Sequence, residues 1–214
     1  MKDIEKAAGF LTLFADNVSA GMDVEPVTWI RENVVDQQSA RSSHIDFTLS
    51  PFLLDPIDKF LNDGTVKHIN LMAPTGSGKS TLFVGLLNYL IANDAGNTLV
   101  AFQNEQETSD FAETRLFPTF RDNKALKDLL PKKRHAARKT EILFPHMNLW
   151  MVSATKGQLQ SKSCRYLIGD EMWAWEKGMV REFLARHHDR FNRKILMVSQ
   201  GGDKGTDWVD EYGK

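Results

Sequence analysis

The 214-residue sequence has a single cysteine, Cys164, which excludes an intrachain disulfide and a cysteine-based metal cluster. It has no apolar run near the roughly 20 residues that a membrane-spanning helix needs. Residues 1–21 lack the basic start and the long apolar stretch of a secretory signal peptide. These absences favour a cytoplasmic protein without a membrane partner, and we expect Cys164 to be a small buried side chain beside a strand.

The sequence also lacks an excess of charge of either sign, because it has 27 basic and 28 acidic residues and a formal net charge of −1. This balance gives no overall attraction to nucleic acid, so any DNA contact must come from a local cluster. The densest basic cluster is PKKRHAARK at residues 131–139. It could contact DNA phosphates, and an ordinary solvated loop is an equally good interpretation.

What is present is typical of an α/β domain with a substantial core. Residues 1–45 read as a polar, helical lead-in and linker, and residues 46–214 as the main domain. Predicted strands lie at residues 66–72, 98–102, 141–144, 148–154, 165–169 and 194–199. Predicted helices lie at residues 53–61, 81–92, 105–117 and 177–190, and Pro118 is expected to stop the third. Strands that alternate with helices predict a parallel sheet with helices on both faces.

The most specific motif is APTGSGKS, between the predicted strand 66–72 and the helix 81–92. Gly76 and Gly78 permit a tight turn whose backbone N–H groups converge on phosphate oxygens, and the helix points its positive end at the same anion. Lys79 would reach the β- and γ-phosphates, and the Ser80 hydroxyl would be a Mg²⁺ ligand. The predicted phosphate-binding residues are Ala73, which replaces the usual glycine, Pro74, Thr75, Gly76, Ser77, Gly78, Lys79, Ser80 and Thr81.

Hydrolysis of a bound nucleotide also needs an acid that organises the metal and a group that activates water. The run YLIGDE at residues 166–171 offers both where an apolar strand ends. We expect this strand to lie beside the 66–72 strand, with Asp170 holding Mg²⁺ opposite Ser80. Glu171 would orient and polarise the attacking water. The alternative is a strand end with exposed acids and no such role.

Further predicted strands and helices lie between the loop and the strand that carries the Asp-Glu pair. This order, with glutamate directly after aspartate, indicates a RecA-like P-loop NTPase of the inserted-strand (ASCE) type rather than a small-molecule kinase. The strand 194–199 ends in Ser199 and Gln200, whose side chains are candidate sensors of the γ-phosphate. The alternative is a strand-to-loop turn that needs only the glycines that follow.

These residues together resemble a known family. The loop, FPHMNLWMVSAT, SKSCRYLIGDEMWAW and FNRKILMVSQGG recur in that order in the N-terminal ATPase domain of the large terminase subunit of tailed bacteriophages, most like the lambda-type branch. The resemblance covers residues 45–206. It implies an ATP- and Mg²⁺-dependent motor that pushes double-stranded DNA into a preformed capsid. It further implies a homo-oligomeric ring on the portal protein, a terminase small subunit as partner, and action at the procapsid in the host cytoplasm.

The sequence departs from that family in three ways. The phosphate loop reads like a helicase loop, the last strand ends Ser-Gln-Gly rather than Ser/Thr-Thr-Pro, and we expect no nuclease activity because the 214 residues leave no room for the family's second domain. A superfamily 2 helicase core is therefore the nearest alternative function. A nucleotide-gated assembly module with a vestigial ATPase is a non-enzymatic alternative, which the intact loop and Asp-Glu pair disfavour.

Weaker candidates complete the sequence-based interpretation. Arg181, Arg186, Arg190 and Arg193 are each candidates for an arginine finger, although ordinary surface charge explains each one singly. Trp173 and Trp175 are expected to pack the loop that holds the acids, with base stacking as the alternative. His187 and His188 point apart on a helix and do not suit one metal ion. Weak candidates for adenine contact are Phe47, Pro51 and Phe52.

Overall fold

The centre of the molecule is a seven-stranded sheet in the computed structural model, which describes residues 24–36, 44–131, 137–138, 140–187 and 192–212. The strands follow the spatial order β1-β7-β6-β2-β5-β4-β3, and those from β1 to β5 in that order are parallel. β4 pairs antiparallel with β5 on one side and with β3 on the other. Their bounds are β1 His68–Met72, β2 Thr98–Phe102, β3 Ala137–Arg138, β4 Glu141–Leu143, β5 Asn148–Ser153, β6 Tyr166–Gly169 and β7 Lys194–Ser199.

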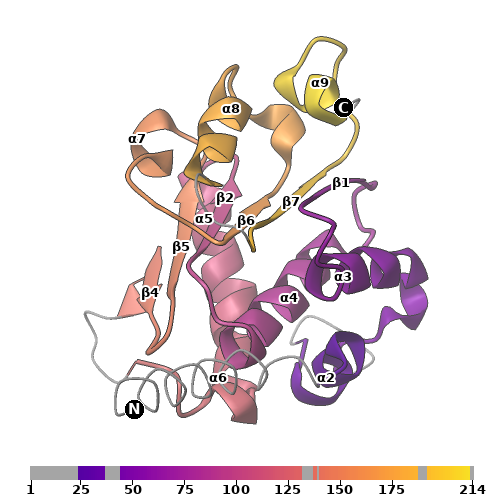
Figure 1. Ribbon diagram of the computed structural model, residues 1–214, viewed down its shortest axis with the longest axis vertical. Helices are drawn as coiled ribbons and strands as arrows, with labels where there is room; N and C mark the ends of the chain where they lie inside the picture. The colour runs from indigo at the N-terminus through magenta and orange to yellow at the C-terminus, as the bar shows by residue number, and fades with distance from the viewer. Residues whose placement is uncertain (1–23, 37–43, 132–136, 139, 188–191, 213–214) are drawn as a thin grey trace, which may run out of the picture.

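Helices cover both faces of this sheet, as predicted (Figure 1). Their bounds are α2 Pro26–Asn33, α3 Leu54–Leu61, α4 Lys79–Asn93, α5 Glu105–Phe111, α6 Phe117–Asp122, α7 Lys156–Leu159, α8 Met179–Leu184 and α9 Asp207–Tyr212. Short 3-10 turns are η1 Phe47–Leu49, η2 Pro51–Leu53, η4 Lys124–Leu126, η6 Met172–Ala174 and η7 Ala185–His187, and a π-helix, η3, spans Ala112–Leu116. None of the helices described has the length and apolarity to cross a membrane.

Side-chain alternation along the strands builds two hydrophobic cores. In β2, Val100 and Phe102 belong to the core shared with α4, while Leu99 and Ala101 belong to the core shared with α7, α8 and α9. Successive residues of a strand point to opposite faces, so a strand covered on both sides reads as one continuous apolar run. This is why the 98–102 and 194–199 strands were predicted with the bounds that the structure has.

Part of the predicted lead-in packs directly on the main domain. Glu25 caps α2, because its carboxylate accepts hydrogen bonds from the N–H groups of Val27 and Thr28. Ile30 of α2 is fully buried and would lie 3.0 Å from a Cβ added to Gly85, so α2 meets α4 where the latter has no side chain. Residues 24–36 therefore share the core of α4. Residues 1–23 and 37–43 lie outside the part of the chain described here.

The order of strands corrects one expectation. β7, not β6, is the neighbour of β1, and β6 lies one strand further into the sheet. The 66–72 and 165–169 strands were expected to be adjacent, with Asp170 at the same carboxyl edge of the sheet as the loop. The inserted strand instead places the end of β7 between the phosphate loop and the Asp-Glu pair, which agrees with the predicted inserted-strand class.

The helix expected to stop at Pro118 continues as α6 to Asp122. The N–H of Phe117 bonds to the carbonyl of Ala112, five residues back, so the chain turns wide at η3 before the proline. Pro118 then falls in the first turn of α6, where a missing N–H costs little. Two further helices, α9 and the short α7, have no counterpart among the predicted ones.

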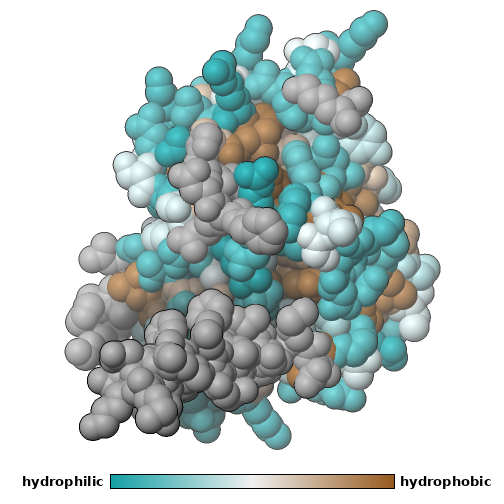
Figure 2. All heavy atoms as spheres, viewed as in Figure 1, coloured by the Kyte–Doolittle hydropathy of each residue, from teal (hydrophilic) through white to brown (hydrophobic). Residues whose placement is uncertain are grey.

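Among the described residues, polar side chains cover most of the face in Figure 2, and apolar ones appear as small patches between them. Among the residues that the structure describes, Leu49 and Phe52, which precede the phosphate loop, are the most exposed large apolar side chains, at 73% and 48%. Cys164 is buried, as predicted.

Candidate nucleotide-binding site

The phosphate loop joins β1 to α4 at the carboxyl edge of the sheet. Its first residue, Ala73, donates its N–H to the carbonyl of Ser199 at 2.9 Å, which ties the loop to the end of β7. Gly76 and Gly78 have φ angles of +77° and +91°, a region that side-chain-bearing residues seldom adopt. A Cβ on Gly78 would also lie 3.2 Å from Leu53 Cδ1, so this glycine is required twice over.

A residue outside the motif holds the loop from the opposite side. The Ser50 hydroxyl donates to the carbonyl of Ser77 at 3.1 Å, and Ser50 lies between η1 and η2. Sequence reasoning missed Ser50, since no local pattern distinguishes it from other serines and its role depends on how η2 packs. The Ser77 hydroxyl is itself buried and makes no hydrogen bond within the described residues. A buried hydroxyl without a partner is costly, so a polar group that approaches this loop would be stabilised.

Lys79 is 7% exposed and lies inside the loop that it follows. Its ammonium group donates to the carbonyls of Ala73 and Pro74 at 3.2 and 3.0 Å, and it lies 3.4 Å from a carboxylate oxygen of Glu171. The carbonyl contacts place the cation at the mouth of the loop. The structure therefore brings together the predicted phosphate ligand and the predicted water-activating acid.

The Asp-Glu pair follows β6 at the same edge of the sheet. The Asp170 N–H bonds to the carbonyl of Ala101, and its carboxylate accepts the N–H of Glu171 at 3.0 Å. Glu171 has a left-handed backbone, with φ +46°. Burial and the neighbouring charge of Glu171 raise the pKa of Asp170 to about 7. The left-handed backbone of Glu171 is uncommon for a non-glycine residue and is found where the surrounding structure enforces it, often at functional sites.

Ser80, Asp170 and Glu171 line one cavity of about 210 Å³. Hydroxyl and carboxylate oxygens are the ligands that Mg²⁺ prefers, so the donor set around this cavity fits that ion. The cavity is also lined by Glu107 and Arg115, which sequence reasoning did not single out. Burial raises the pKa of the Glu107 carboxyl, and the charge of Glu171 raises it further.

The end of β7 contacts both the loop and the segment that follows the acids. The Ser199 hydroxyl, fully buried, accepts the N–H of Trp173 at 3.0 Å. On the other side, the Thr75 hydroxyl donates to the side-chain carbonyl of Gln200 at 3.1 Å. The two candidate sensors therefore lie between the phosphate loop and the segment after Glu171.

The two tryptophans after the acids differ from each other. Trp175 is almost buried, packs edge-on against Phe183 and donates its indole N–H to the carbonyl of Asp170. Trp173 is 40% exposed and donates its indole N–H to a carboxylate oxygen of Glu171 at 2.9 Å. Trp175 thus packs the loop as expected, whereas Trp173 contacts the candidate catalytic carboxylate directly.

Other predicted residues lie away from this cavity or are otherwise engaged. The Thr81 hydroxyl donates to Asp36 at 3.2 Å. Phe47 is 3% exposed and part of the core, so it does not present a face to a base, whereas Phe52 remains accessible. Among the arginines proposed as fingers, Arg181, Arg186 and Arg193 do not line the cavity, and Arg190 lies outside the described residues. His188 and residues 132–136 and 139 of the basic cluster also lie outside them.

Comparison with known proteins connects this geometry to one family. A family model described as the ATPase domain of the phage terminase large subunit gpA matches residues 39–212. No curated protein matches the chain.

The fold is similar to the large terminase of bacteriophage HK97, with a TM-score of 0.71 and 15% identity over 87% of this chain and 39% of that one. A mutant ATPase domain of the Thermus phage P74-26 large terminase is similar with a TM-score of 0.53 and 12% identity, over 77% of this chain and 71% of that one. The UvsW helicase of bacteriophage T4 is similar with a TM-score of 0.57 and 14% identity, over 95% of this chain and 73% of that one. At these identities the likeness shows a shared RecA-like fold, and the chain spans well under half the length of the HK97 terminase.

Proposed function

This chain belongs to the family of phage terminase large subunit gpA ATPase domains, and from that premise we propose that it hydrolyses ATP to drive double-stranded DNA into a procapsid. The observation that carries the proposal is the convergence of Lys79, Ser80, Asp170 and Glu171 at one edge of the sheet. The role belongs to a ring of copies acting at the portal vertex in the host cytoplasm, with the portal protein and a terminase small subunit as partners.

The proposed chemistry is divided among the residues of the loop and the Asp-Glu pair. Backbone N–H groups of residues 73–81 and the Lys79 ammonium bind the phosphates. Glu171 accepts a proton from the attacking water and orients it towards the γ-phosphate, and its left-handed backbone aims the carboxylate at Lys79. Ser80 and Asp170 would hold Mg²⁺, which when bound neutralises charge that develops on the phosphate oxygens.

The proposed report of hydrolysis passes through the end of β7. Gln200 contacts the loop through Thr75, and Ser199 contacts the segment after Glu171 through Trp173. A change in the phosphates would alter the first contact, and the rigid β7 backbone would carry the change to the second. Trp208 of α9 donates its indole N–H to the carbonyl of Gln200, so α9 is the nearest element to respond.

A helicase-type, DNA-dependent ATPase is the alternative function. It is favoured by the helicase-like spelling of the loop and by the similarity of the fold to UvsW. A helicase needs a second RecA-like domain, so that the two domains can close on the nucleic-acid strand that lies between them. Terminase-family membership favours packaging instead.

Phosphate release measured with and without double-stranded DNA tests the proposal. We expect DNA-stimulated hydrolysis that Glu171→Gln reduces on the order of 10²- to 10⁴-fold while ATP binding persists. Near-normal hydrolysis by that variant would refute the assignment. A strand-displacement assay separates the alternatives, because a packaging motor is expected to leave a partial duplex intact and to be stimulated by portal-bearing procapsids.

A further inference from the structure

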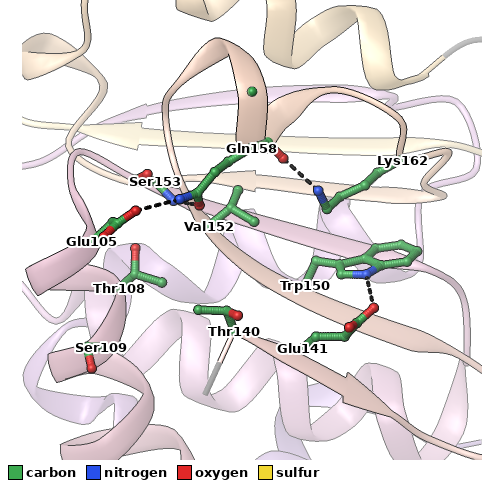
Figure 3. Close-up of a pocket in the computed structure, with 11 residues that line it drawn as sticks. Glu105, Thr108, Ser109, Thr140, Glu141, Trp150, Val152, Ser153, Gln158 and Lys162 are labelled. Carbon is green, nitrogen blue, oxygen red and sulfur yellow. Dashed lines mark hydrogen bonds between the residues drawn. The ribbon is translucent and has the colours of Figure 1, made fainter. Parts of the chain in front are cut away.

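Two tryptophans in the described part of the chain donate their indole N–H to a glutamate carboxylate. One pair, Trp150 and Glu141 at 2.8 Å, joins the neighbouring strands β5 and β4 beside a cavity of about 620 Å³ (Figure 3). Among the described residues, this cavity shares no lining residue with the nucleotide site. The other pair is Trp173 and Glu171 at 2.9 Å. The first pair ties two strands together, whereas the second includes the carboxylate proposed as the general base.

Both carboxylate oxygens of Glu171 are engaged, each by a different donor. Oε1 lies 3.4 Å from the ammonium nitrogen of Lys79, and Oε2 accepts the indole N–H of Trp173. A bound nucleotide would affect the two contacts differently, because its phosphates compete for Lys79. The indole belongs to the segment after Glu171 and not to the phosphate loop. Binding of nucleotide therefore frees Oε1, while Oε2 stays with Trp173.

A glutamate needs such a second contact before its carboxylate has a fixed direction. The left-handed backbone of Glu171 sets where its side chain starts. The last torsion of a glutamate, between an sp³ and an sp² carbon, is broad, so the backbone does not set the plane of the carboxylate. A hydrogen bond to one oxygen restricts that plane and with it the direction of the other oxygen. A general base works only within hydrogen-bond reach of the proton that it takes.

Trp173 is itself held firmly enough to serve as a fixed donor. Its backbone N–H donates to the hydroxyl of Ser199 at 3.0 Å. Its Cβ lies against Gly202, where an added Cβ would be only 3.1 Å away. Met172 and Trp175, in the same turn, are buried. The turn that carries the indole is therefore anchored both to the end of β7 and to the core.

We propose that Trp173 is a positioning residue for hydrolysis, whose indole N–H holds one oxygen of the Glu171 carboxylate so that the other faces the attacking water. The inference rests on the proposed ATPase function and adds a residue to its site. Trp173 acts through Glu171 and has no contact with the nucleotide in this role. Its substitution should therefore change the rate of hydrolysis and leave ATP binding in place.

Steady-state hydrolysis by Trp173→Phe tests the proposal, because phenylalanine keeps an aromatic ring and lacks the N–H. We expect kcat to fall on the order of 10- to 100-fold, the effect of a misplaced reacting group, with KM for ATP within about twofold of the parent. Trp150→Phe is the matched control. It loses an indole–glutamate hydrogen bond of the same kind away from the nucleotide site and should keep the parental kcat. Equal losses of kcat and ATP affinity in Trp173→Phe would overturn the proposal.

Two further variants separate the hydrogen bond from the ring. Trp173→benzothienylalanine keeps the bicyclic ring and replaces the N–H by sulfur, so we expect kcat to fall as in Trp173→Phe. A parental kcat in this variant would show that the ring alone suffices, and the proposal would be wrong. In the Glu171→Gln background, Trp173→Phe should cause no further fall, because both changes act on one carboxylate. A further fall by the full factor would also contradict it.

The contact can be followed without turnover through the NMR signal of the Trp173 indole N–H, assigned with Trp173→Phe. The signal should move in Glu171→Gln and stay in place in Glu176→Gln, and an unmoved signal in the first variant would overturn the inference. Failure of the inference and of the proposed function are distinguishable. Near-normal hydrolysis by Glu171→Gln removes both, whereas lost turnover in that variant with a parental kcat in Trp173→Phe removes only the role of Trp173.

Discussion

The ammonium nitrogen of Lys79 lies 3.4 Å from a carboxylate oxygen of Glu171. The loop motif directs the same ammonium group towards the nucleotide phosphates. Phosphate oxygens and Glu171 therefore compete for one cation, and nucleotide binding must weaken the ion pair. The competition leaves Glu171 free to turn towards water once the phosphates hold Lys79.

Glu171→Gln is consequently expected to bind ATP more tightly than the parent. The amide carries no charge, so Lys79 is released to the phosphates. Loss of a partly exposed ion pair of this kind changes the affinity on the order of two- to fivefold. Isothermal titration with ATP measures it. Glu176→Gln, an exposed acid nearby in sequence, should leave the affinity unchanged. Weaker ATP binding by Glu171→Gln would contradict the competition.

Ser199→Ala should lower stability and uncouple the site. The substitution removes the fully buried Ser199 hydroxyl, which is the acceptor of the backbone N–H of Trp173. Leaving this N–H without its acceptor costs about 1–3 kcal/mol. Urea unfolding measures the loss, and Ser163→Ala, at an exposed serine, is the control. We also expect hydrolysis to fall more than ATP affinity, because the Ser199 side chain contacts the segment after Glu171, whereas its contact with the phosphate loop is made by the backbone carbonyl, which alanine keeps. An equal loss of both would indicate a purely structural role.

Gly78→Ala should damage the loop through its backbone. The φ of +91° costs a non-glycine residue about 1–3 kcal/mol, and the new Cβ would crowd Leu53. We expect ATP affinity to drop on the order of tenfold, since 1.4 kcal/mol corresponds to that factor. Gly64→Ala provides the comparison, because nothing lies within 4 Å of its Cβ and its φ is not in the left-handed region. Equal ATP affinity in the two variants would exclude a role for the Gly78 conformation.

Asp94→Ala should destabilise the fold without touching the nucleotide site. Asp94 accepts two hydrogen bonds from Arg165, at 2.6 and 3.0 Å, and one from the hydroxyl of the buried Tyr166 at 2.6 Å. Losing the acceptor of a buried hydroxyl costs about 1–3 kcal/mol. Asp55→Ala removes an exposed helical pair with Lys59 and should cost only about 0.3–0.5 kcal/mol. Thermal unfolding of both variants distinguishes the two kinds of pair.

The parts of the fold that sequence predicted well are those specified by local patterns. β2 and β7 are covered on both faces, so their continuous apolar runs mark their ends directly. The loop is similarly local, since its glycines, lysine and serine are consecutive. Class, helix coverage of both faces and family followed from these elements and their order, and the comparisons confirm them.

The parts that sequence missed depend on long-range packing. The position of β7 between β1 and β6 reflects pairing across most of the chain, which strand patterns do not encode. The contact of Ser50 with the loop depends on how η2 packs against it, and the continuation through Pro118 depends on a π-turn that no residue type marks. Glu107 of α5 and Arg115 of η3 reach the nucleotide cavity through helix geometry alone.

The pairing of β1 has a consequence for how the protein is made. Its ladder partner is β7, the strand of the described sheet nearest the C-terminus. On the ribosome, the phosphate-loop strand is therefore synthesised long before its partner, and the contacts from Ala73 and Thr75 to the end of β7 form only after residues 194–200 have been made. A nascent chain that ends before β7 therefore lacks the ladder partner of β1 and the contacts that Ser199 and Gln200 make with the phosphate loop.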